Sequence, residues 1–168
     1  MIKTDIKKII FMNIEYINIY NNLVNLSRNK NLFFNFIKKD TFSDRLIIFL
    51  FHFAFFLKNF KIKIDQKYLQ SFYDYVFRQI ELDIREIGYG DASVNKKMKT
   101  YVNLLYSIIN KIDKWDHYNS NEKINILNFF IEIKDNSEKF IDYFDRYSLY
   151  LSKKTLNSFT KSVLDHKF

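Results

Sequence analysis

The sequence predicts an all-α fold, a single-domain bundle of about six to eight helices that spans residues 1–168. The chain has no proline and only two glycines, Gly88 and Gly90, whereas sandwiches and barrels need turn residues every few positions. Apolar residues make up 48% of the chain and aromatic residues 19%. This composition suits a chain with a hydrophobic core and is far too apolar for a disordered one.

The first predicted element is an amphipathic helix near residues 5–27. Its apolar side chains recur at helical spacing: Ile6, Ile9, Ile10, Tyr16, Ile17, Tyr20 and Val24. A shorter apolar piece follows at residues 32–37. The apolar run near the N-terminus is too short for a secretory signal, so we expect none.

The next element is a central helix that runs to about Phe60, with Asp40 and Thr41 as N-cap candidates. Residues 46–57 are apolar on nearly every face of this helix. The run has 12 residues, whereas a membrane span needs about 20. Two interpretations stay open, a helix buried by its neighbours and an interfacial or partner-binding helix.

The clearest pattern is a helical hairpin over residues 66–115. Apolar stripes at three- and four-residue steps predict helices at 66–87 and 92–115. The joint between them contains both glycines, so we expect a left-handed helix end there and Asp91 as the N-cap of the second helix. The two helices should pack antiparallel, with their stripes against the central helix.

The C-terminal third predicts three shorter helices. Asn119 and Glu122 have the spacing of a capping box, which favours a helix from there to about Ile133. Apolar residues from 140 to 151 mark another helix. Leu156, Phe159 and Val163 mark a last short one.

The sequence gives little sign of catalytic chemistry. There is no cysteine, which excludes disulfides and thiolate chemistry. His52, His117 and His166 lie far apart, and none is paired with another metal ligand at helical spacing, so we expect no metal and no cofactor. The glycine pair lacks the third glycine of a dinucleotide motif and follows a helix instead of a strand. Two carboxylates flank that pair, Glu86 and Asp91, either as an acid–base pair or as ordinary helix-end carboxylates.

A structural network is expected around the start of the central helix. Either Asp40 or Asp44 can pair with Arg45, because an arginine beside a buried helix normally needs a carboxylate partner. Thr41 belongs to the same helix start. His52 lies inside the apolar run, as a buried histidine bonded to a carbonyl or carboxylate, or as a haem ligand.

The chain is basic, with a formal net charge of +8 and a pI of about 9.4. Such a charge favours nucleic acid, anionic lipid or an acidic protein surface without distinguishing them. The best local cluster of basic residues follows the two glycines. It is either a solvated helix face or a binding face, in which a nearby aromatic side chain could stack on RNA. The binding-face interpretation comprises Arg78, Arg85, Lys96, Lys97 and Lys99, with Tyr89.

Residues 84–99 resemble the signature of the ubiquinol–cytochrome c chaperone family, which is close to L-R-E-M-G-V-G-D-x-x-V-x-K/R-K/R-M-K. Ile84 stands for the leucine and Ile87 for the methionine, and Tyr89 replaces an aliphatic residue. Residues 40–46, D-T-F-S-D-R-L, look like the family's D-T-x-x-G-R-F, with Asp44 in place of the glycine. His52 falls where the family has a Leu-His pair. The likeness spans about residues 20–115 and, more loosely, the C-terminal helices.

The resemblance implies a non-enzymatic, all-helical assembly factor for the cytochrome bc1 complex, which is respiratory complex III. The expected partners are newly made cytochrome b, a small partner protein and the ribosome, with no small-molecule substrate. The expected location is the cytoplasm, with peripheral contact at the inner membrane, or the matrix side of a mitochondrion. Lacking a transit-like extension, the chain looks like a bacterial or minimal form.

The predicted partner-binding site is the basic face and the glycine joint, and exposed aromatics near the central helix are the predicted client surface. The site comprises Arg78, Arg85, Glu86, Gly88, Tyr89, Gly90, Asp91, Lys96, Lys97 and Lys99. Two other classes of function stay open. A basic helical RNA- or membrane-surface-binding module would bind bulk RNA or anionic vesicles in a salt-sensitive way. An enzyme using Glu86, Asp91 and His52 would need a closed polar pocket that joins them.

Overall fold

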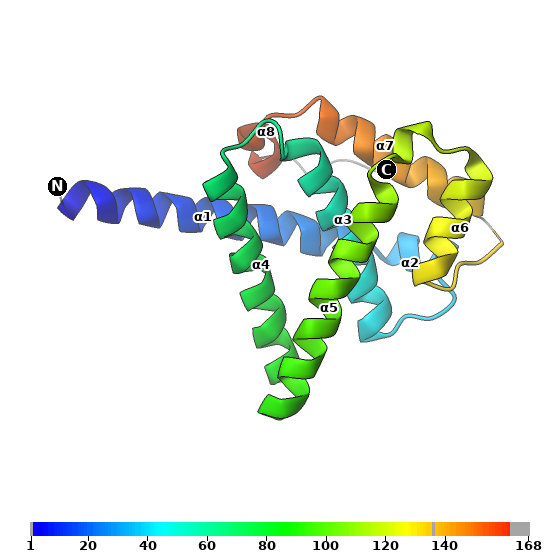
Figure 1. Cartoon of the computed structure of the whole chain (residues 1–168), viewed down its shortest axis with the longest axis horizontal. Coiled ribbons are helices and arrows are strands. Elements are labelled where there is room, and N and C mark those ends of the chain that lie inside the picture. The colour runs from blue at the N-terminus through cyan, green and yellow to red at the C-terminus, as the bar shows by residue number, and fades with distance from the viewer. Residues whose placement is uncertain (1, 136, 162–168) are drawn as a thin grey trace.

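The computed structural model describes residues 2–135 and 137–161, with side chains over residues 14–135 and 137–160. In these ranges the chain forms eight α-helices and one short 3-10 helix (Figure 1), which confirms the all-α prediction. The elements are α1 (Ile2–Ser27), α2 (Lys30–Phe36), α3 (Phe42–Phe60), α4 (Gln66–Glu86), α5 (Asp91–Ile112), η1 (Trp115–His117), α6 (Ser120–Phe130), α7 (Ser137–Ser152) and α8 (Leu156–Lys161). The predicted apolar position Val163 lies outside the described residues.

Helix α3 is the centre of the bundle. It packs against α1, α5 and α7, and Phe72 of α4 contacts the rings of Phe53 and Phe56. Phenylalanines on several faces of α3 are therefore buried, including Phe51 and Phe55 at 0% exposure. Each such burial contributes about 1.5–3 kcal/mol. The central-helix interpretation is thus confirmed over the interfacial one, and none of the described helices has the length and apolarity to cross a bilayer.

The first and last helices lie side by side. The C-terminal half of α1 packs on α3 and on α8, while its N-terminal half extends away from the bundle (Figure 1). The side-chain amide of Asn22 donates to the backbone carbonyl of Phe159 at 2.8 Å. Phe159 in turn contacts the rings of Phe56 and Phe60. Helix α8 therefore closes the core over the end of α3.

Two of the predicted helices end earlier than expected. Helix α5 stops at Ile112, and the predicted end residue Trp115 lies in η1, fully buried, where its indole Nε1–H donates to Asp145 at 2.6 Å. Helix α6 begins at a capping box of Asn119 and Glu122, as predicted, but stops at Phe130. In both cases a buried tertiary contact overrides the helical pattern.

The segment after α6 is extended and pairs with the segment after α2. Ile131 and Ile133 are buried and Glu132 between them is exposed, which is the alternation of a strand. Ile37 and Ile133 form an antiparallel bridge, and the Lys38 N–H donates to the Glu132 carbonyl at 3.0 Å. The helix predicted to run to about Ile133 therefore ends at Phe130, and this pairing was not predicted.

Helices α4 and α5 form the predicted antiparallel hairpin. They lie close together at the corner and separate toward the body of the protein (Figure 1). Across the separating part, the rings of Tyr73 and Tyr106 lie 6.4 Å apart. The hairpin thus has a closed end at the glycines and an open end beside α3.

Candidate functional site

The corner between α4 and α5 depends on Gly88. This residue has a φ of +100°, and its N–H donates to the Arg85 carbonyl at 2.9 Å. A side chain with a Cβ disfavours such a backbone conformation. The left-handed helix end predicted at the glycine pair is confirmed at Gly88.

Helix α5 begins differently from the prediction. Its N-cap is Gly90, with φ −71° and ψ 161°, and no side chain accepts the first backbone N–H groups of α5. The prediction that Asp91 is the N-cap is therefore wrong. Asp91 is the first residue of α5, where its carboxylate still interacts favourably with the helix dipole.

Arg85 forms ion pairs on both sides of the corner. Its Nε donates to Glu81 at 2.9 Å, one turn earlier on α4, and its Nη1 donates to Asp91 at the start of α5. Hydrogen bonding to Asp91, and then to Glu81, raises the pKa of Arg85. Only the Glu81–Arg85 spacing of four residues was visible in the sequence. The network ties the two helices together and neutralises the Arg85 charge within the chain.

The predicted lysine cluster lies on α5 just beyond the corner. The ammonium of Lys97 sits over the ring of Tyr89, 4.3 Å from its centroid, and Lys96 and Lys99 are exposed. Among the described residues, no carboxylate lies within ion-pair distance of these three lysines. We call Tyr89, Lys96, Lys97 and Lys99 the basic corner, because their positive charge is open to a partner.

Two predicted residues lie beside this set. Arg78 is exposed on α4 and lines a hollow with Tyr16 of α1. It precedes Arg85 by two turns, about 10 Å along the axis. Glu86 is exposed at the end of α4. The structure thus joins Tyr89 with Lys97 and Arg85 with Asp91, and it places Arg78 outside this group.

The predicted network at the start of α3 divides into two local contacts. Asp40 accepts two hydrogen bonds from the Arg45 guanidinium, at 2.6 and 2.7 Å, and this contact holds the pKa of Asp40 below its ordinary value. Thr41 is the N-cap of α3 and forms a capping box with Asp44. Both contacts are exposed to solvent and define where α3 begins.

His52 lies deeper, in the core between α3 and α7. Its Nδ1 lies 2.7 Å from the Ile48 carbonyl, and its Nε2 lies 2.6 Å from the Tyr143 hydroxyl. Because a carbonyl only accepts, Nδ1 carries the proton and Nε2 accepts from Tyr143. Burial lowers the pKa of His52 to about 4. Both ring nitrogens are therefore used in hydrogen bonds within the protein, as the buried-histidine interpretation predicts.

The structure does not assemble the residues of the enzyme interpretation. Glu86 and Asp91 lie at the exposed corner, whereas His52 is sealed in the core. No cluster of three or more potential metal-ligating side chains occurs within the described ranges. The corner presents exposed charged side chains, and His52 has a structural position.

Comparison with known proteins gives one family. A family model described as ubiquinol-cytochrome C chaperone matches residues 36–121, slightly more than half of the chain. The matched region contains α3, α4, the corner and α5. No curated protein and no solved structure matches the chain.

Proposed function

Because the chain belongs to the ubiquinol–cytochrome c chaperone family, we propose that it is an assembly chaperone of respiratory complex III that binds newly made cytochrome b. The matched region includes the hairpin corner, where Lys96, Lys97 and Lys99 have no ion-pair partner among the described residues. The role needs binding surfaces and no reacting groups. The observation that carries the proposal is the basic corner inside the family-matched segment.

The basic corner is proposed to bind the ribosome. Lys96, Lys97 and Lys99 lack acidic partners among the described residues, and the chain carries a net charge of +8. Lysines of this kind neutralise phosphates and release counterions, so binding should weaken steeply as salt rises. Contact with ribosomal RNA would hold the chaperone where cytochrome b is made.

The test of the chaperone role is deletion of the gene, followed by a reduced-minus-oxidised haem spectrum of the membranes and a complex III activity assay. We expect loss of the b-type haem signal and of complex III activity, with other respiratory complexes retained. Expression of the intact chain should restore both. An unchanged spectrum would reject the chaperone role and leave an RNA- or membrane-surface-binding module as the better hypothesis.

The test of the basic corner is charge reversal of its three lysines to glutamate, measured by cosedimentation with ribosomes at increasing salt. The slope of log affinity against log salt is negative, and it should become shallower by about 2 to 3, because each lysine accounts for about one phosphate contact. The control reverses Lys67, Lys114 and Lys153, which are exposed and change the net charge by the same amount. An equal loss in both variants would mean that net charge, and not this corner, governs binding.

A further inference from the structure

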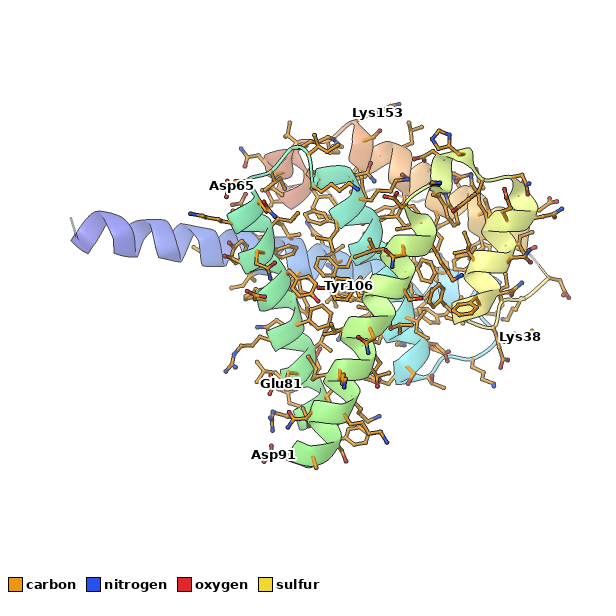
Figure 2. All side chains as sticks on the ribbon, viewed as in Figure 1. Lys38, Asp65, Glu81, Asp91, Tyr106 and Lys153 are labelled. Atoms are coloured by element: carbon orange, nitrogen blue, oxygen red, sulfur yellow. The ribbon has the colours of Figure 1, made fainter. Side chains whose placement is uncertain are left out.

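A groove lies at the open end of the hairpin, far from the basic corner. Its floor is formed by Leu57 of α3, Leu69 and Tyr73 of α4, and Tyr106 and Ile109 of α5. The groove has a volume of about 280 Å³, and Tyr106 lies between α4 and α5 in Figure 2. Two separating helices and a third beneath them thus leave an open, mainly apolar trough.

The groove is open and lies at the lower size limit of small-molecule pockets, which argues against a ligand that must be enclosed. Pockets for such ligands usually have about 300–1,000 Å³ and enclose most of the ligand surface. This one leaves Tyr106 at 54% exposure. A helix that lays one apolar stripe into a trough needs less volume, because only the side chains of that stripe enter.

The charged groups at the groove already have partners within the chain. Lys58 pairs with Asp116 at 2.6 Å, and Lys61 pairs with Asp113 at 3.4 Å. The rings of Tyr73 and Tyr106 lie 6.4 Å apart across the groove, and burial raises the pKa of Tyr73. The groove therefore presents apolar surface without unpaired charge, in contrast to the basic corner.

We propose that this groove binds an uncharged apolar α-helix of a client polypeptide, through a stripe of aliphatic side chains. The inference rests on the proposed function for the source of that helix, a newly made membrane protein, and it names the kind of segment recognised. A charged segment is disfavoured because its charge would be desolvated without a partner. Nucleic acid and anionic headgroups find unpaired cations at the basic corner instead.

The two surfaces are far enough apart to act independently. Tyr73 at the groove and Gly88 at the corner are separated by 15 residues of chain, which is about 22 Å of helix. A client helix in the groove would leave the lysines of the corner uncovered. One molecule can therefore hold a client segment and a polyanionic surface at the same time.

The experiment uses the full chain and a fluorescent, end-capped peptide of about 14 residues, about 21 Å as a helix. Leucines form one stripe and alanine and glutamine fill the other positions. A second peptide carries two glutamates in that stripe. The variants are Tyr106→Arg and, as the control, Leu149→Arg on α7, because these side chains are 54% and 55% exposed. Circular dichroism checks that both variants are folded.

We expect the leucine peptide to bind the intact chain, with an affinity that changes little with salt. Tyr106→Arg should weaken binding by about tenfold or more, because it places an unpaired charge against the apolar stripe, while Leu149→Arg should leave it within about twofold. Three results would overturn the proposal. They are an equal loss of peptide affinity in both variants, equal binding of the glutamate peptide, and displacement of the leucine peptide by anionic phospholipid vesicles.

These outcomes separate the groove from the chaperone role. Peptide binding that depends on Tyr106, together with normal complex III in the deletion strain, would support the groove and reject the proposed function. Loss of complex III in the deletion strain, with no effect of Tyr106→Arg on peptide binding, would support the function and reject the groove.

Discussion

We expect the protein to lose stability below neutral pH, and we expect replacement of His52 by glutamine to remove a large part of that loss. His52 is fully buried, and its two ring nitrogens bond to the Ile48 carbonyl and the Tyr143 hydroxyl. Protonation would add a second N–H that faces a hydroxyl already oriented as a donor, in a site without water contact. The folded protein therefore holds His52 in its neutral form.

The size of the expected loss of stability follows from the difference between the pKa of His52 in the folded protein and in the unfolded chain. The pKa of His52 is about 4 in the folded protein, against an ordinary value of 6.5 in the unfolded chain. As pH falls below 6.5, the unfolded chain takes up this proton first, so the free energy of unfolding decreases. The decrease is about 1.4 kcal/mol for each pH unit. It reaches about 3 kcal/mol near pH 4, and above pH 6.5 it vanishes.

The assay is urea unfolding followed by circular dichroism between pH 7.5 and about 4.5. The glutamine variant should be less stable at pH 7 by about 1–3 kcal/mol, because buried hydrogen bonds are lost. This deficit should shrink as pH falls, since the variant lacks the titrating group. The other histidines are present in both proteins, so their contributions cancel.

Parallel stability curves for the two proteins would refute the reasoning. A direct check is the NMR titration of the His52 imidazole in the intact protein. A midpoint near 6.5 would show that the ring is reached by water and is not held neutral by burial.

Three further predictions concern stability, each measured by urea unfolding. Gly88→Ala should lower the free energy of unfolding by about 1–2 kcal/mol, while Gly90→Ala, at a φ of −71°, should change it by less than half as much. Lys63 donates to backbone carbonyls at the C-terminal end of α7, so Lys63→Met should cost about 0.5–1 kcal/mol, and the cost should shrink in high salt. Phe55 is fully buried and stacks on Phe144, so Phe55→Ala should cost about 3–5 kcal/mol, and a cost below 1 kcal/mol would mean that the core closes around the cavity.

The helices could be predicted because their signals are local. Thr41 and Asn119 each begin a capping box that spans four residues. Gly88 adopts the positive φ at the point where α4 ends. The apolar stripes of α4 and α5 repeat with helical period, so the hairpin followed from spacing alone. The position of His52 also followed, because its neighbours on every face of α3 are apolar.

The rest depended on contacts between distant parts of the chain. The bridge between Ile37 and Ile133 joins segments whose short apolar runs look equally helical in the sequence. The N-cap of α5 is Gly90, one residue before the predicted position, and the Asp91 carboxylate bonds to Arg85 on the neighbouring helix α4. The groove arises from the angle between α4 and α5, which the sequence of neither helix encodes.

The contact between Asn22 and Phe159 sets the order in which this protein can mature as it is synthesised. These residues are 137 positions apart, and at 5–20 residues per second the ribosome needs about 7 to 27 s to make that length. During this time α1 can dock on α3, but the rings of Phe56 and Phe60 wait for Phe159 to cover them. Helix α8 therefore docks on α1 last, and the core closes only after most of the chain has left the ribosome.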